Sequence, residues 1–123
     1  MSYKPKDIRD AVFFQAGDGT HLTELYHPKN GDKNLSFSLA YAKLLPGASS
    51  LKHELGQEEL YIFTKGKGEI IIDTEKTAIK SGQSILVPRK TLQYVRNTGD
   101  EELCFYCIVS PPWTEEEEQI LED

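Results

Sequence analysis

Glycine and proline residues divide this chain into short apolar segments at fairly even intervals. Almost all of its nine glycines and six prolines fall between these segments, where they favour turns. The segments are rich in β-branched and aromatic residues and cover residues 21–26, 35–45, 60–64, 69–72, 84–87, 92–96 and 103–109. Many short strand-like segments separated by turn residues predict an all-β fold, either a sandwich or a barrel.

The length of the chain predicts one domain with one core. Its 123 residues contain no internal repeat and no linker-like segment, and 38% of them are hydrophobic, as in ordinary globular proteins. We therefore expect a single domain over residues 1–123, with a barrel over about residues 20–110.

A helical signal lies near the C-terminus. Thr114 and Glu117 have the spacing of a capping box, in which the cap residue and the third helical residue exchange hydrogen bonds. This pattern predicts a short acidic helix over about residues 114–122, whose glutamates stabilise the helix N-terminus. A metal-binding acidic tail is a less favoured interpretation of the same residues.

The charge of the chain argues against two classes of partner. Fourteen Lys and Arg residues against twenty Asp and Glu residues leave a formal net charge of -6, so we expect no binding to nucleic acid or anionic membranes. The apolar segments are far shorter than the roughly 20 residues of a membrane-spanning helix. The charged, proline-containing start does not resemble a secretory signal, so we expect a cytoplasmic protein.

Two cysteines, Cys104 and Cys107, have a spacing that in other settings indicates a redox pair or half of a zinc site. Their neighbours predict a strand instead. Residues three apart on a strand point to opposite faces and lie about 10 Å apart, which is beyond the reach of a disulfide. We interpret both side chains as buried, reduced thiols.

Alternation along three predicted strands places polar groups on otherwise apolar faces. His53, Glu59 and Gln93 each share a face with apolar residues two positions away. If these faces line one barrel interior, an imidazole, a carboxylate and a carboxamide meet in an apolar cavity, where unpaired polar groups are costly. Mutual hydrogen bonds or a metal ion would remove that cost.

Eight residues between positions 47 and 97 resemble the two sequence motifs of the cupin superfamily. They keep the family's intervals, with Gly47, His53, Glu59 and Gly66 in the first motif and Gly82, Pro88, Gln93 and Asn97 in the second. The resemblance implies a small single-domain cupin, which is a jelly-roll β-barrel built from two antiparallel sheets.

Three positions depart from the family pattern. Leu55 and Gln93 stand where the motifs have histidine, and Lys90 stands where the second motif has glycine. A full family site offers three histidines and a glutamate to a divalent ion, so the resemblance implies that His53, Glu59 and Gln93 remain as metal ligands. One imidazole with oxygen donors does not discriminate among Fe, Mn, Ni and Zn. Alternatively, the three side chains form a buried hydrogen-bonded cluster without a metal.

Three other residues are candidates for the same pocket. Tyr61 follows Glu59 on the same strand face, so we expect it to bind a ligand through its hydroxyl, or else to serve as a core aromatic residue. His21 or His27 would complete the site if it pointed inward in place of the histidine replaced by Leu55. A histidine at a strand end is more often at the surface.

The resemblance implies a divalent-metal pocket that acts on a small polar, oxygen-rich molecule, as the dioxygenases, isomerases and decarboxylases of the family do. The alternative is a non-catalytic module that binds a small ligand and has a degenerate metal site, and a purely structural dimer is a third possibility. Leu60 and Ile62 form an apolar opposite face on their strand, and the resemblance to small cupins implies that such a layer packs in a homodimer.

Overall fold

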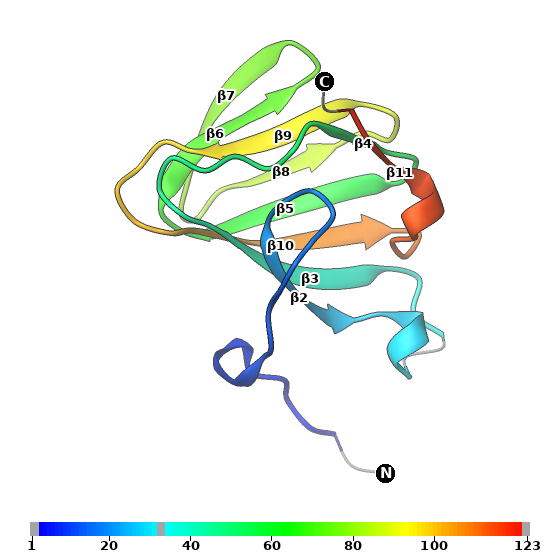
Figure 1. Ribbon diagram of the computed structural model, residues 1–123. Coiled ribbons are helices and arrows are strands. Elements are labelled where there is room, and N and C mark those ends of the chain that lie inside the picture. Colours follow the sequence, from blue (N-terminus) through cyan, green and yellow to red (C-terminus); the bar gives the residue numbers. More distant parts are fainter. Residues whose placement is uncertain (1–2, 32–33, 122–123) are drawn as a thin grey trace.

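The computed structural model describes residues 3–31 and 34–121 and contains two antiparallel sheets that face each other (Figure 1). The first sheet has the order β1 (Phe14–Gln15), β2 (His21–Tyr26), β3 (Ser38–Leu44), β10 (Leu103–Ser110), β5 (Glu58–Lys65) and β8 (Ser84–Val87). The second has the order β11 (Glu118–Ile120), β4 (His53–Leu55), β9 (Leu92–Asn97), β6 (Lys67–Ile72) and β7 (Glu75–Lys80). The predicted all-β jelly roll is therefore confirmed.

Side-chain alternation along the strands builds the core between the sheets. On β5, Glu59, Tyr61 and Phe63 are buried, whereas the residues between them are only partly buried. The ring centroid of Phe63 lies 6.0 Å from that of Tyr61 and 5.4 Å from that of Phe105. These rings belong to the main hydrophobic core between the sheets, and the Tyr61 hydroxyl lies where this core meets polar residues of the interior.

Strand register brings the polar residues of the two motifs together. His53 of β4 lies directly opposite Gln93 of β9, in the second sheet. In the first sheet, Tyr61 lies opposite Cys107, and Glu59 lies opposite Val109. All of these side chains point into the barrel, and all except that of Val109 carry polar atoms, as alternation along the strands predicts.

The C-terminal segment differs from its prediction. Instead of a helix over about residues 114–122, the chain has one 3-10 turn, Glu115–Glu117, followed by β11, and Thr114 makes no side-chain capping bond; residue 122 lies outside the described residues. β11 pairs with β4 and forms the edge of the second sheet, so that Glu118 lies opposite Leu55 and Ile120 opposite His53. An isolated short helix is only marginally stable, and the free edge of β4 offers the same backbone better partners.

The two cysteines are free, buried and on opposite faces of β10, as predicted. Cys107 belongs to the core between the sheets, whereas Cys104 packs with Leu25 and Tyr41 on the other face of the first sheet. Their strand therefore explains the Cys-x-x-Cys spacing without a disulfide or a zinc site.

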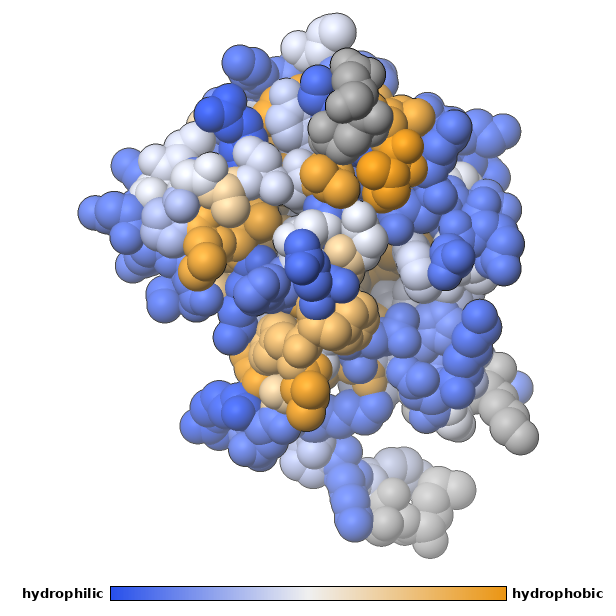
Figure 2. All heavy atoms as spheres, viewed as in Figure 1, coloured by the Kyte–Doolittle hydropathy of each residue, from blue (hydrophilic) through white to orange (hydrophobic). Residues whose placement is uncertain are grey.

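The outer face of the first sheet carries Leu60 and Ile62, which are partly buried. In the same view as Figure 1, the surface is mostly hydrophilic, and its apolar side chains form several separate patches (Figure 2). The homodimer implied by the family resemblance stays a prediction. No helix in the described part of the chain is long and apolar enough to cross a membrane.

The aromatic core provides a test of the fold. Phe63 is 1% exposed, and its replacement in Phe63→Ala leaves a cavity between the sheets. We expect the free energy of unfolding, measured by urea denaturation, to fall by about 3–5 kcal/mol. Leu45 is 58% exposed, so Leu45→Ala is the control and should change stability by less than about 0.5 kcal/mol. Equal losses in the two variants would contradict this description of the core.

Candidate functional site

His53 opens strand β4 and is almost completely buried. Its ring nitrogen Nδ1 lies 2.8 Å from the carbonyl oxygen of Leu51 and donates a hydrogen bond to it. A histidine that donates from Nδ1 carries its lone pair on Nε2, and a bond to a backbone carbonyl is a common way to fix a metal-binding imidazole. The local backbone therefore holds the ring in the tautomer and orientation that metal binding needs.

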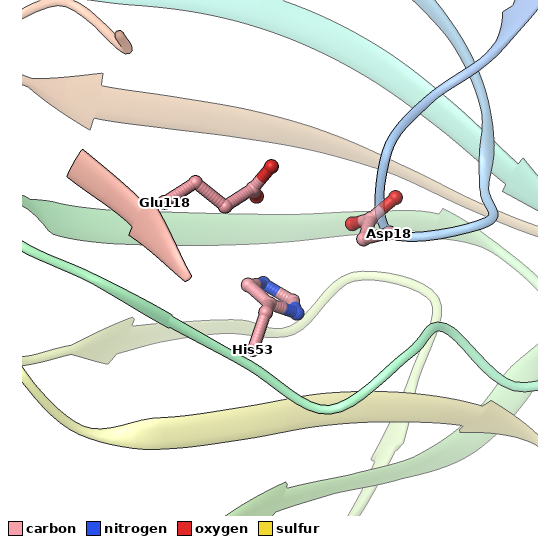
Figure 3. A group of neighbouring side chains, drawn as sticks. All are labelled: Asp18, His53 and Glu118. Carbon is pink, nitrogen blue, oxygen red and sulfur yellow. The ribbon is translucent and has the colours of Figure 1, made fainter. Parts of the chain in front are cut away.

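Two carboxylates lie beside this imidazole. Ligand atoms of Asp18, His53 and Glu118 all lie within 4.8 Å of one another. Figure 3 shows the three side chains pointing toward a common space from three different elements: the loop between β1 and β2, strand β4 and strand β11. They form what we call the Asp–His–Glu cluster.

Asp18 is held in place by its own turn. Its Oδ1 accepts hydrogen bonds from the backbone nitrogen of Thr20 (3.1 Å) and from the Thr20 hydroxyl (2.7 Å). Gly19 has a φ of 88°, which glycine adopts without strain. The Asp18 carbonyl accepts from the backbone nitrogen of Leu51, 2.6 Å away, and this bond ties the loop to the segment that leads into His53.

Glu118 is positioned by backbone pairing across β4. It pairs with Leu55, and the neighbouring Glu117 carbonyl accepts from the backbone nitrogen of Gly56 at 2.9 Å. Burial raises the pKa of Glu118, His53 lowers it, and the negative charge of Asp18 raises it further. A cation between the two carboxylates would relieve this repulsion.

The donor set of the cluster fits a divalent ion. One imidazole nitrogen and two carboxylate oxygens are ligands that Zn, Mn, Fe and Ni accept. Bonds of about 2.0–2.2 Å to one ion require ligand atoms no more than about 4.4 Å apart, so only small side-chain movements would be needed.

A second group of polar side chains lies next to the cluster, and it contains the other residues predicted from the motifs. The Tyr61 hydroxyl lies 3.3 Å from Glu59 Oε1 and also contacts Gln93 Oε1. A hydroxyl has one proton and cannot donate to both oxygens. Among the described residues, Gln93 Nε2 is buried without a partner. Rotating the Gln93 amide lets Nε2 donate to Tyr61 while Tyr61 donates to Glu59, and it leaves the amide oxygen free to accept.

Glu59 lies deep in the barrel and close to the cluster. Burial raises its pKa to about 7; the charge of His53 opposes this shift, Asp18 adds to it, and hydrogen bonds from Cys107 and Tyr61 oppose it. Burial also raises the pKa of the Cys107 thiol and of the Tyr61 hydroxyl well above their usual values. Near neutral pH, Glu59 can therefore either give or take a proton, whereas Cys107 and Tyr61 stay protonated.

A cavity of about 190 Å³ opens beside these groups. The inner face of the first sheet, the β1–β2 loop and the C-terminal segment enclose it, and most of its wall is apolar. It is lined by Phe14, Ala16, Gly17, Asp18, Leu22, Glu24, Ser38, Ala40, Glu59, Cys107, Val109, Trp113 and Glu118.

The structure thus places the predicted residues in two neighbouring groups. His53 belongs to the Asp–His–Glu cluster, whereas Glu59, Gln93 and Tyr61 form the hydrogen-bonded group beside it. The assignment of His53, Glu59 and Gln93 as metal ligands stays a prediction, as does ligand binding by Tyr61.

Neither of the other two histidines joins the cluster. His21 is exposed at the start of β2. His27 is buried, but its Nε2 bonds to the Trp113 carbonyl at 2.7 Å and its Nδ1 accepts from the backbone nitrogen of Lys29 at 3.0 Å. His27 therefore anchors the C-terminal segment and does not replace a lost metal ligand.

Sequence analysis missed Asp18 and Glu118. Asp18 stands between two glycines in a turn, and Glu118 ends a run of four glutamates, to which we gave a helix-stabilising role. Glu118 lies beside His53 instead. This placement is closer to the less favoured interpretation of these residues, a metal-binding acidic tail. The acidic run was the one signal in the sequence that Glu118 could lie at the site. The pairing of β11 with β4, which brings Glu118 to His53, cannot be predicted from local residues.

Comparison with known proteins identifies the fold. The family model described as "Cupin domain" matches residues 40–109. The uncharacterized protein MJ1618 of Methanocaldococcus jannaschii is 37% identical over 106 residues, 85% of this chain and 84% of that protein.

Solved structures agree with the family match. The plu4264 protein of Photorhabdus luminescens is 26% identical, with a TM-score of 0.72 over 94% of this chain and 89% of that one. A predicted oxalate decarboxylase of Thermotoga maritima is 19% identical, with a TM-score of 0.74 over 84% of this chain and 95% of that one, and it supports the fold alone.

The raised pKa of Glu59 predicts a pH dependence of stability. Because the folded-state pKa is about 7 and the ordinary value is 4.5, the folded protein binds the proton more tightly. The tighter proton binding adds about 3 kcal/mol to the free energy of unfolding. This contribution is fully present below pH 4.5 and is lost as the pH rises to about 7. Glu59→Gln lacks this titration. Between pH 4 and pH 8, the free energy of unfolding of the unsubstituted protein should therefore fall by about 3 kcal/mol relative to that of Glu59→Gln.

Urea unfolding of both proteins in the presence of a chelator measures this difference. A constant difference between the two proteins across the pH range would show that the Glu59 carboxyl titrates normally.

Proposed function

This chain belongs to the cupin family, and on that premise we propose that it holds a divalent metal ion in its barrel and acts on a small polar, oxygen-rich molecule. The Asp–His–Glu cluster beside the 190 Å³ cavity is the observation that carries this proposal. The cluster supplies three ligand atoms of suitable chemistry, and the cavity supplies room for a molecule next to them.

Three side chains would hold the ion: Asp18, His53 through Nε2, and Glu118. Glu59 lines the same cavity and Gln93 lies opposite His53, so either side chain would add a further oxygen ligand or bind the molecule instead. When bound, a divalent ion polarises an oxygen of the substrate or lowers the pKa of a bound water.

The protein's own groups have separate tasks in this proposal. Glu59, with a pKa of about 7, exchanges a proton with the bound molecule at a carboxyl oxygen, provided that it is not itself a metal ligand. Tyr61 holds Glu59 through its hydroxyl and orients it. The apolar wall, including Trp113, excludes water and strengthens these polar interactions.

A non-catalytic ligand-binding module is the second candidate, and a specific observation favours it. Leu55 stands where the family motif has a histidine, and its side chain is 2% exposed, so this position offers only apolar contact to the interior. A site that has lost family ligands can keep its pocket without turnover. Proton NMR can monitor a small molecule incubated with the metal-loaded protein. Binding without conversion of the molecule would support this candidate over an enzyme.

Metal content tests the proposed ion directly. Tag-free protein incubated with Fe, Mn, Ni or Zn and analysed by plasma mass spectrometry should retain about one ion per chain. Asp18→Asn, His53→Ala and Glu118→Gln each remove one ligand and should weaken binding about 100-fold or more. Glu116 is exposed in the adjoining turn, so Glu116→Gln is the matched control and should bind normally.

Retention of the ion by all three ligand variants, or no ion in the unsubstituted protein, would contradict the proposal. Glu59→Gln separates two ligand sets: normal binding supports the Asp–His–Glu cluster alone, and loss of binding adds Glu59 as a ligand.

A further inference from the structure

We propose that the cavity selects a small molecule that carries a positive charge, of the amino alcohol class, over a carboxylate of the same size. This inference rests on the proposed function for the metal ion at the Asp–His–Glu cluster and for the molecule in the cavity beside it, and it replaces the oxygen-rich character of that molecule by one hydroxyl and one ammonium group.

The charges that line the cavity carry this inference. Four lining residues are acidic, namely Asp18, Glu24, Glu59 and Glu118, and none of the described lining residues is Lys, Arg or His. A divalent ion at the cluster balances the charges of Asp18 and Glu118. Glu24 still leaves the cavity negative, and Glu59 adds to this charge whenever it is ionised, so an anion entering the cavity meets like charge and a cation meets opposite charge.

Glu24 is placed to meet the positive end of such a molecule. It lies on β2, it is partly buried, and its Oε1 accepts a hydrogen bond from the side-chain amide of Asn30 at 3.0 Å. Asn30 is neutral, so this bond orients the carboxylate without balancing its charge.

The shape and walls of the cavity define the rest of the molecule. A volume of about 190 Å³ equals that of about six water molecules in the liquid, which corresponds to a molecule of about six or seven non-hydrogen atoms. The walls contributed by Phe14, Leu22, Val109 and Trp113 favour a short apolar body. A hydroxyl at one end suits the metal site, and an ammonium group at the other suits Glu24.

The chain offers a built-in probe of binding. Trp113 is its single tryptophan, and it lines the cavity. A molecule that enters the cavity should therefore change the tryptophan fluorescence, and no second tryptophan contributes to the signal.

Three probes that share the neopentyl skeleton and one hydroxyl isolate the effect of charge. They are neopentanolamine, a cation; neopentyl glycol, which is neutral; and hydroxypivalate, an anion. Each is titrated at pH 7.5 into the metal-loaded protein and into chelator-treated protein. We expect neopentanolamine to bind at least about tenfold more tightly than hydroxypivalate, with the glycol between them.

A variant pair locates the charge. Glu24→Gln should weaken binding of neopentanolamine about fivefold or more and leave binding of the glycol within about twofold. Glu75 begins β7, away from the residues that line the cavity, so Glu75→Gln makes the same change in net charge and should leave all three affinities unchanged.

The outcomes separate this inference from the proposed function. If no ion binds, the proposed function fails, but chelator-treated protein still tests the preference for a cation. If the ion binds and hydroxypivalate binds at least as tightly as neopentanolamine, the inference is overturned and the metal site stands. Absence of binding by all three probes, or an unchanged affinity for neopentanolamine in Glu24→Gln, also overturns it.

Discussion

The hydrogen bonds between β11 and β4 are the interaction on which the candidate site depends. β4 contributes His53, and the pairing of β11 with its outer edge brings Glu118 beside the imidazole. The same C-terminal segment is fastened at its start, where the Trp113 carbonyl accepts from His27 and the Trp113 backbone nitrogen donates to Ser38 Oγ at 2.9 Å. One side of the Asp–His–Glu cluster and one wall of the cavity are thus built by a segment that lies outside the matched residues 40–109.

The buried polar groups explain why such a site favours a cation. Asp18 and Glu118 lie within reach of each other, and burial adds to their mutual repulsion, as the raised pKa of Glu118 indicates. Glu59 is more deeply buried and has Tyr61 and Cys107 as hydrogen-bonding neighbours, and Gln93 contacts the same Tyr61 hydroxyl. Buried polar groups are costly unless hydrogen bonds, opposite charges or a ligand compensate them, and this cost is the physical reason for the binding site that we propose.

The barrel was predictable from the sequence, whereas His53 was the only member of the Asp–His–Glu cluster among the predicted metal ligands. Turn residues and strand alternation are local, so they indicated the strands and the inward positions of His53, Glu59 and Gln93. Asp18 and Glu118 reach the site through a loop and an added edge strand, and their placement depends on contacts between residues far apart in the chain. The glutamates near Thr114 also matched a helix pattern, but backbone pairing with the edge of β4 outweighed this local preference.

Anomalous diffraction from crystals of tag-free, zinc-loaded protein, recorded at the zinc absorption edge, would locate the ion that we propose. We predict one anomalous peak per chain, bounded by Asp18, His53 Nε2 and Glu118. A peak elsewhere, or an ion bound by His53, Glu59 and Gln93 without the two carboxylates from the loop and β11, would contradict this prediction.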